Sequence, residues 1–109
     1  MKLVIAVIQD KDSGKLLENL VDEGFKTTKL ASTGGFLKSG NTTVLIGVED
    51  HQTSEVVEII KKVCKSREKM VTTMSPIGGS VESYVPYPVE VVVGGATIFV
   101  IDVDQFERV

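Results

Sequence analysis

The sequence has little cysteine and histidine and no excess of positive charge. Cys64 is the only cysteine and His51 the only histidine among 109 residues. A single cysteine cannot form a disulfide within the chain, and with one histidine it cannot supply the four ligands of a structural zinc site. Lys+Arg number 12 and Asp+Glu 15, for a net charge of -3, so no broad positive field attracts nucleic acid or an anionic membrane. We expect neither as a partner.

Long apolar runs are also missing. No stretch approaches the roughly 20 residues that cross a bilayer, and the apolar run at residues 3–8 is followed by Asp10 rather than by a signal-peptide cleavage pattern. We therefore expect a cytoplasmic protein. A hydrophobic content of 42% is typical of a globular chain, and we expect residues 1–109 to form one domain. So short a chain can bury one core but not also enclose a deep cavity, so a sizeable ligand site is expected in a surface groove or between subunits.

Two similar units make up the first part of the chain. Residues 3–8 form a short run rich in β-branched side chains, typical of a buried strand, and residues 42–48 repeat it at an offset of 40. Each run ends in acidic residues and is followed by apolar residues at helical spacing. The first helix is expected to be capped by Asp10, Asp12 or Ser13 and to stop at Gly24, before a half-exposed strand from Phe25 to Ala31. The apolar helix positions are Leu16, Leu17, Leu20 and Val21 in the first unit and Val56, Val57, Ile60, Val63 and Cys64 in the second.

The rest of the chain, from residue 66, begins with a segment that lacks periodicity. Residues 66–88 contain all three prolines, and they predict a long loop. Strand patterns return at 89–93 and 96–103, around Gly94-Gly95, which permits a hairpin turn or a bulge.

The order β-α-β-β-α-β predicts an α+β, ferredoxin-like fold, an antiparallel sheet with two helices on one face. The strands expected at 3–8 and 89–103 carry apolar residues on both faces of that sheet. The second face must therefore be covered elsewhere, and association of several copies is the simplest way to cover it. We expect an oligomer.

The short loop at residues 32–41 and its flanks combine glycines, hydroxyl side chains, lysines, Phe36 and Asn41. Such residues can bind phosphate oxygens, pack on a base and read an adenine edge. Neither a Walker A loop nor a G-x-G-x-x-G fingerprint is present, and on composition alone a plain flexible loop is the favoured interpretation.

Several longer motifs of the chain resemble those of a known family. They are Lys29 to Leu37, Gly40 to Thr43, Leu45 to Glu49, Cys64 to Arg67 and Gly94 to Thr97. With these motifs the chain resembles the PII-like cyclic di-AMP receptor family over nearly its whole length. The resemblance implies a homotrimer in which three sheets enclose a central core. It also implies that each cleft between neighbouring subunits holds one cyclic di-AMP, with no other cofactor.

The resemblance also implies which residues contact the ligand. They are Thr28, Gly35, Phe36, Leu37, Asn41 and Gly47, with Lys26 beside phosphate and Gln105 reaching in from the neighbouring chain. Lysine offers phosphate a point charge where an arginine would offer a fork of donors. Guanine reverses the donor and acceptor at position six of the purine, so Asn41 and Gly47 can explain a preference for adenine.

The long loop is the better candidate for presenting a changing surface to an unidentified protein target. Met70, Met74, Tyr84 and Tyr87 provide it with adaptable apolar contacts. A loop without any partner remains an equal interpretation of the same residues.

The other candidate residues favour structural interpretations. His51 is expected in the first turn of the second helix without a metal, and Cys64 in the core. Asp102, Asp104 and Glu107 suggest a solvated strand edge, and no pairing of a nucleophile with a base is evident, so we expect no catalysis. Two rival hypotheses stay open. One is a PII-like regulator that binds ATP or ADP, and the other a ferredoxin-like enzyme or metal-handling trimer related by fold alone.

Overall fold

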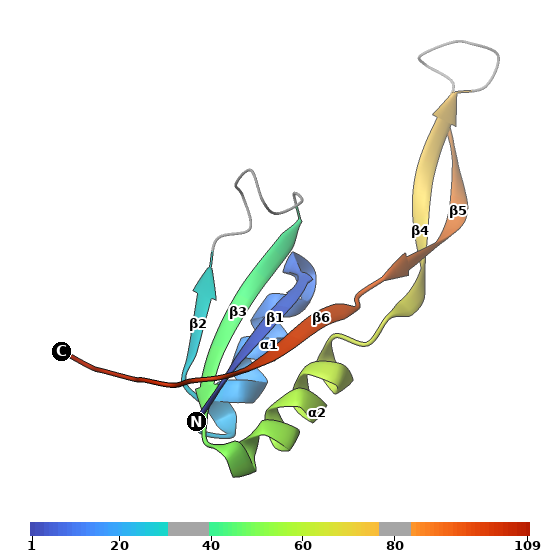
Figure 1. Cartoon of the computed structure of the whole chain (residues 1–109). Helices are drawn as coiled ribbons and strands as arrows, with labels where there is room; N and C mark the ends of the chain where they lie inside the picture. The colour runs from blue at the N-terminus through green and yellow to red at the C-terminus, as the bar shows by residue number, and fades with distance from the viewer. Residues whose placement is uncertain (31–39, 77–83) are drawn as a thin grey trace.

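A four-stranded antiparallel sheet and two helices form the body of the chain (Figure 1). The computed structural model describes residues 1–30, 40–76 and 84–109, and of residues 72–76 and 84–87 the backbone alone. The elements in chain order are β1 (Lys2–Gln9), α1 (Asp10–Asp22), β2 (Thr27–Leu30), β3 (Asn41–Val48), the short 3-10 helix η1 (Asp50–Gln52), α2 (Thr53–Val63), β4 (Arg67–Pro76), β5 (Tyr84–Val93) and β6 (Ala96–Asp102).

The strand order β2-β3-β1-β6, with every neighbour antiparallel, confirms the predicted α+β, ferredoxin-like arrangement. The two repeated strands lie side by side at its centre. Ile5 pairs with Leu45, its equivalent at the offset of 40, so a pseudo-twofold axis passes between these two residues. The internal repeat is thus visible as a local symmetry of the sheet.

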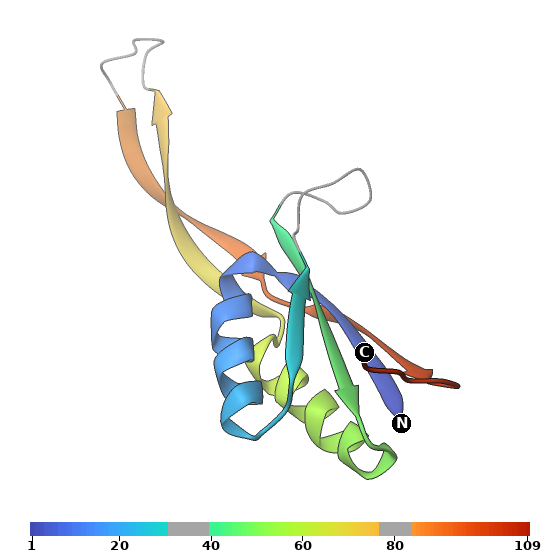
Figure 2. The same ribbon diagram turned by 90° about the vertical axis from the view of Figure 1, so that its left-hand side faces the viewer.

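One face of the sheet forms the core. Alternate residues of a strand point to the same face, and those of β1 and β3 that meet the helices are fully or nearly fully buried. Figure 2 shows both helices on this one side of the sheet. The core consists of Val4, Ala6, Ile8, Leu16, Leu20, Phe25, Val44, Ile46, Val48, Val56, Ile60 and Cys64.

The opposite face of the sheet is also apolar. The cross-strand row Leu45, Ile5 and Phe99 lies on it, and so does Ile101 of β6. Phe99 is 53% exposed and Ile101 47%, although both are large apolar side chains. A contiguous apolar surface of this kind is typical of an interface rather than of a surface that faces solvent.

The prediction of a long loop at residues 66–88 was wrong. Strands β4 and β5 pair in antiparallel register from Arg67↔Val93 to Pro76↔Tyr84 and form a ribbon that projects from the body (Figure 1). The prolines obscured the strand pattern in the sequence. Each strand of a two-stranded ribbon is an edge strand, where a proline can place its nitrogen on the side without a hydrogen-bonding partner. Residues 77–83 lie outside the described part of the chain.

The projecting ribbon makes the chain elongated. Its radius of gyration is 18.6 Å, against about 13 Å for a compact chain of this length.

Gly94 and Gly95 form neither a hairpin turn nor a bulge between the last two strands. Strand β5 pairs with β4 and strand β6 with β1, so the two glycines are the corner at which the chain passes from the ribbon to the main sheet. Both have positive φ, 85° and 92°. A Cβ at Gly94 would lie 2.5 Å from the Lys65 carbonyl oxygen, so the corner requires glycine there for space as well as for conformation.

The elements differ from prediction in small ways at their ends. No side chain caps α1, which begins at Asp10 directly after β1, although Ser13 Oγ donates to the Asp10 carbonyl at 2.7 Å. The predicted stop at Gly24 agrees with its φ of 86°. Strand β2 starts at Thr27 rather than at Phe25, which is buried in the core.

Replacing Leu20 by alanine tests the packing of α1 on the sheet. Leu20 is 0% exposed, so Leu20→Ala should lower the free energy of unfolding by about 2–5 kcal/mol in denaturant titrations. Its neighbour Val21, which the sequence placed on the apolar helix face, is instead 60% exposed, so Val21→Ala should change the free energy of unfolding by about 0.5 kcal/mol or less. Equal losses from the two variants would contradict the assigned helix face.

Candidate functional site

A groove of about 750 Å³ lies at the end of the uncovered sheet face where β3 ends and the C-terminal tail begins. The tail leaves β6 and runs past the start of β2 (Figure 1). The groove contains three residues of the predicted site, Lys26, Thr28 and Gly47. Its full lining is Met1, Leu3, Lys26, Thr28, Leu45, Gly47, Glu49, Val103, Phe106, Glu107 and Arg108.

Strand register explains why these residues meet. Thr28 pairs with Leu45, and Gly47 pairs with Leu3, so the four residues stand in two adjacent rows on one face of the sheet. Gly47 has no side chain and is exposed, and a Cβ there would meet nothing within 4 Å. The strand backbone is therefore open at Gly47 between two leucines, and the floor is suited to a flat apolar ring such as a nucleobase.

The rim of the groove carries charges of both signs. Lys26 and Arg108 supply cations, and Glu49 and Glu107 supply carboxylates. An arginine offers a planar fork that matches two phosphate oxygens, whereas lysine acts as a compact point charge. The groove can therefore receive an anion at one part of its rim and hydrogen-bond donors at another.

Asn41 lies at the opposite end of β3 from Gly47. They are six positions apart in the sequence, which is about 20 Å along a strand. Asn41 instead lines a smaller hollow of about 270 Å³, bounded by the ends of β1 and β6 and by Gly94-Gly95. Residues 41 and 47 share a face of the strand, so both open onto the same side of the sheet.

The structure leaves the remaining predicted contacts undecided. Gly35, Phe36 and Leu37 lie outside the described residues. Gln105 is exposed in the tail and does not line the groove of its own chain, and its predicted contact is with a neighbouring chain.

Sequence reasoning missed part of the groove. Leu3 and Leu45 were assigned to strands but not to the site, although their odd numbers place them on the same face as Gly47. Phe106 and Arg108 were also missed. An aromatic and an arginine close together in an aperiodic tail were a usable signal, since that pair can stack on a base and bind a phosphate.

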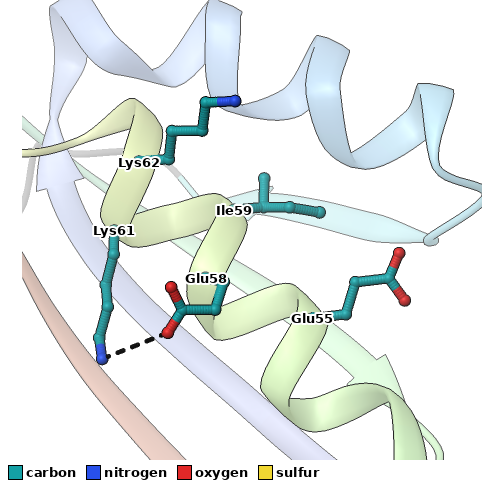
Figure 3. A pocket seen from close by; sticks show the side chains of 5 residues that line it. All are labelled: Glu55, Glu58, Ile59, Lys61 and Lys62. Atoms are coloured by element: carbon teal, nitrogen blue, oxygen red, sulfur yellow. Dashed lines mark ion pairs between the residues drawn. The ribbon is translucent and has the colours of Figure 1, made fainter.

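A third hollow, of about 500 Å³, lies on the surface of α2 (Figure 3). Ile59 points from α2 toward α1, with Lys62 beside it, and Lys61 forms an ion pair with Glu58 at 3.6 Å. The pair is well exposed and spaced three residues apart, typical of a solvated helix surface. None of the predicted site residues lies there.

Comparison with known proteins agrees with these observations. The family model for cyclic-di-AMP receptors matches residues 1–109, the whole chain. The chain belongs to the cyclic-di-AMP receptor family. A solved structure of similar fold is that of a functionally unknown protein from Pediococcus pentosaceus ATCC 25745. It is 48% identical, with a TM-score of 0.78, over 99% of this chain and 96% of the other.

Membership of a cyclic-di-AMP receptor family supports binding and signalling as the activity of the chain. Within 1–30, 40–76 and 84–109, no three His, Cys, Asp or Glu side chains gather as metal ligands, and no helix is long and apolar enough to span a membrane. His51 is exposed in η1, just before α2.

The acidic residues near the end of the chain are exposed, as expected of a solvated edge. Asp102 is the last residue of β6, and Asp104 and Glu107 lie beyond the strand in the C-terminal tail. Asp102 accepts a hydrogen bond from Lys2, which is its cross-strand partner.

Cys64 lies in the core at the end of α2, as predicted. Burial raises the pKa of its thiol to about 11, and the charge of nearby Asp12 acts in the same direction, while Arg67 opposes it. The thiol is therefore protonated near neutral pH, and a protonated buried thiol is a poor nucleophile.

The Cys64 pKa predicts a pH effect on stability. The unfolded chain, with an ordinary thiol pKa near 9.0, ionises before the folded chain does, so the free energy of unfolding should fall as the pH rises from about 9 to about 11. Denaturant titrations of the parent chain and of Cys64→Ala at pH 8 and pH 10 measure this. The parent should lose more stability than the variant, and an equal loss would contradict the assignment.

Proposed function

We propose that this protein is a cytoplasmic signal receptor that binds cyclic di-AMP in clefts between the subunits of a homotrimer. Binding of the ligand rearranges the segments at 32–41 and 66–88, and this rearrangement signals to a protein target. The observation that carries the proposal is the groove that joins Lys26, Thr28 and Gly47 on an uncovered apolar sheet face, in a chain of the cyclic-di-AMP receptor family.

The chemistry of the groove suits the ligand. Cyclic di-AMP carries two phosphates and two adenines, so it needs a few cations and two flat apolar surfaces. Lys26 and Arg108 are available to the phosphates, and the floor around Gly47 is available to one adenine. Asn41 can donate to and accept from an adenine edge.

The separation of the two ends of β3 supports a shared site. A ligand contacting both Asn41 and Gly47 of one chain would bridge about 20 Å, whereas two chains placed side by side can supply the two ends to one cleft. The exposed apolar side chains of Phe99 and Ile101 supply a reason for the sheets to associate.

The β4–β5 ribbon is the proposed surface for the protein target. It projects away from the sheet, and Met70 and Val92, both largely exposed, present apolar contacts on its described part. Met74, Tyr84 and Tyr87 have side chains outside the described part.

A ligand titration tests the proposal directly. The purified protein is titrated with cyclic di-AMP, cyclic di-GMP and ATP by calorimetry while its mass in solution is measured. We expect a trimer that binds cyclic di-AMP at one site per subunit, with much weaker binding of the other two. A monomer, or a trimer indifferent to cyclic di-AMP, would contradict the proposal, and comparable binding of ATP would favour the rival regulator.

Replacing Asn41 by alanine tests adenine recognition. The variant loses the amide that pairs with the base, so its Kd for cyclic di-AMP should rise tenfold or more, equivalent to about 1.4 kcal/mol. Asn19→Ala is the matched control, since Asn19 lies on α1 and its amide donates to the Lys15 carbonyl at 2.7 Å. An unchanged Kd for Asn41→Ala would remove Asn41 from the site.

A further inference from the structure

The corner between β1 and α1, residues 9–12, contacts both the start of β3 and the base of the β4–β5 ribbon. These two regions are far apart in the sequence and have separate parts in the proposed function. The corner is short and regular, because β1 ends at Gln9 and α1 begins at Asp10.

On the β3 side, the contacts are made by Asp10. Its backbone N–H donates to the Gly40 carbonyl at 2.8 Å, and its carboxylate accepts a hydrogen bond from the Thr42 hydroxyl. Thr42 is buried, and the backbone of Asn41 stands between these two contacts. The first residues of β3 are thus tied to the first residue of α1.

On the ribbon side, the contacts are made by Asp12. Arg67 Nη2 donates to Asp12 Oδ1 at 2.8 Å and Nη1 to Oδ2 at 3.4 Å, which is the forked pairing of a guanidinium with a carboxylate. The side chain of Asp12 is 6% exposed, so its charge requires this partner. Arg67 is the first residue of β4 and also donates to the Lys65 carbonyl at 3.0 Å.

Gln9 supplies a second link. It pairs with Asn41 across the sheet, and its side-chain Oε1 accepts a hydrogen bond from the Gly94 N–H at 2.8 Å. The hollow of about 270 Å³ lies at this point and is lined by Asn41, Gln9 and Gly94-Gly95. A ligand group at Asn41 therefore lies beside the glycine corner through which the ribbon joins the sheet.

We propose that Asp12 and Arg67 are positioning residues that couple cyclic di-AMP binding at Asn41 to the orientation of the β4–β5 ribbon. Ligand bound at Asn41 holds the start of β3 against Asp10. The first turn of α1 then holds Asp12 against Arg67, and the ribbon is fixed at its base. The inference rests on the proposed function, since it needs a ligand at Asn41.

Thermodynamic reciprocity gives the proposed coupling a measurable consequence for the Kd of the ligand. If the bound ligand strengthens the Asp12–Arg67 pair, loss of the pair must weaken ligand binding by the same factor, for which about fivefold is the low end of measured couplings. A pair that merely stabilises the fold would leave the Kd of the folded protein unchanged.

The experiment measures amide hydrogen exchange of the full chain with and without saturating cyclic di-AMP, together with its Kd by calorimetry. In the parent, the ligand should slow exchange both at residues 41–43 and at the ribbon base, residues 65–68 and 93–95. In Arg67→Gln it should still slow exchange at 41–43 but no longer at the ribbon base, and the Kd should rise about fivefold or more.

Lys69→Gln is the matched control, because it removes one positive charge from an exposed position on the same strand. It should behave as the parent in both measurements. Asp12→Asn keeps the shape of the side chain and removes the other charge of the pair. It replaces Arg67→Gln in both measurements if Arg67→Gln does not fold.

The outcomes separate the two proposals. No binding of cyclic di-AMP by the parent would overturn the proposed function. Binding without slower exchange at the ribbon base would overturn the coupling alone. A retained response or an unchanged Kd in the folded variants would remove Asp12 and Arg67 from it.

Discussion

Two helices can cover only one face of a four-stranded sheet, and here the strands carry apolar side chains on both faces. The core takes Val4, Ile46 and their alternate neighbours, while Phe99 and Ile101 are left about half exposed. Among the residues that the structure describes, the remaining strands, β4 and β5, pair with each other in the projecting ribbon and leave this second face uncovered. The groove beside Gly47 lies on that same face, so the surface proposed to contact a partner chain also holds the candidate site.

The proposed site divides recognition of the ligand between the two ends of one strand, β3. At one end of β3 two cations and two carboxylates border an apolar floor. At the other end Asn41 presents an amide beside the glycine corner. Charge supplies attraction to any anionic nucleotide, while an amide that reads a base edge supplies selectivity. Separation of these tasks along β3 leaves each end free to contact a different part of the ligand or a different subunit.

Sequence periodicity predicted the sheet, its helices and the buried Cys64, because alternation and helical spacing are imposed by burial and burial dominates the body of the chain. It failed at β4 and at the first half of β5, where the ribbon makes no two-sided core and prolines interrupt the pattern, although the strand predicted at 89–93 is the second half of β5. Capping was also mispredicted. Asp10 and Asp12 have the residue type of helix caps, but their carboxylates bind Thr42 and Arg67, tertiary partners that no local rule reveals. The groove residues Phe106 and Arg108 were missed because the tail has no period at all.

The ribbon leaves and rejoins the body at two points that are themselves neighbours, since Arg67 pairs with Val93. The segment between Arg67 and Val93 is therefore equivalent to an insertion into the body of the chain, and the two ends of this insertion lie next to each other. Changes of length or sequence farther out need not disturb the core, and surface segments of this kind tolerate variation well. Under the proposed function, the same ligand-binding body could therefore acquire different protein targets over evolution through replacement of the outer ribbon alone.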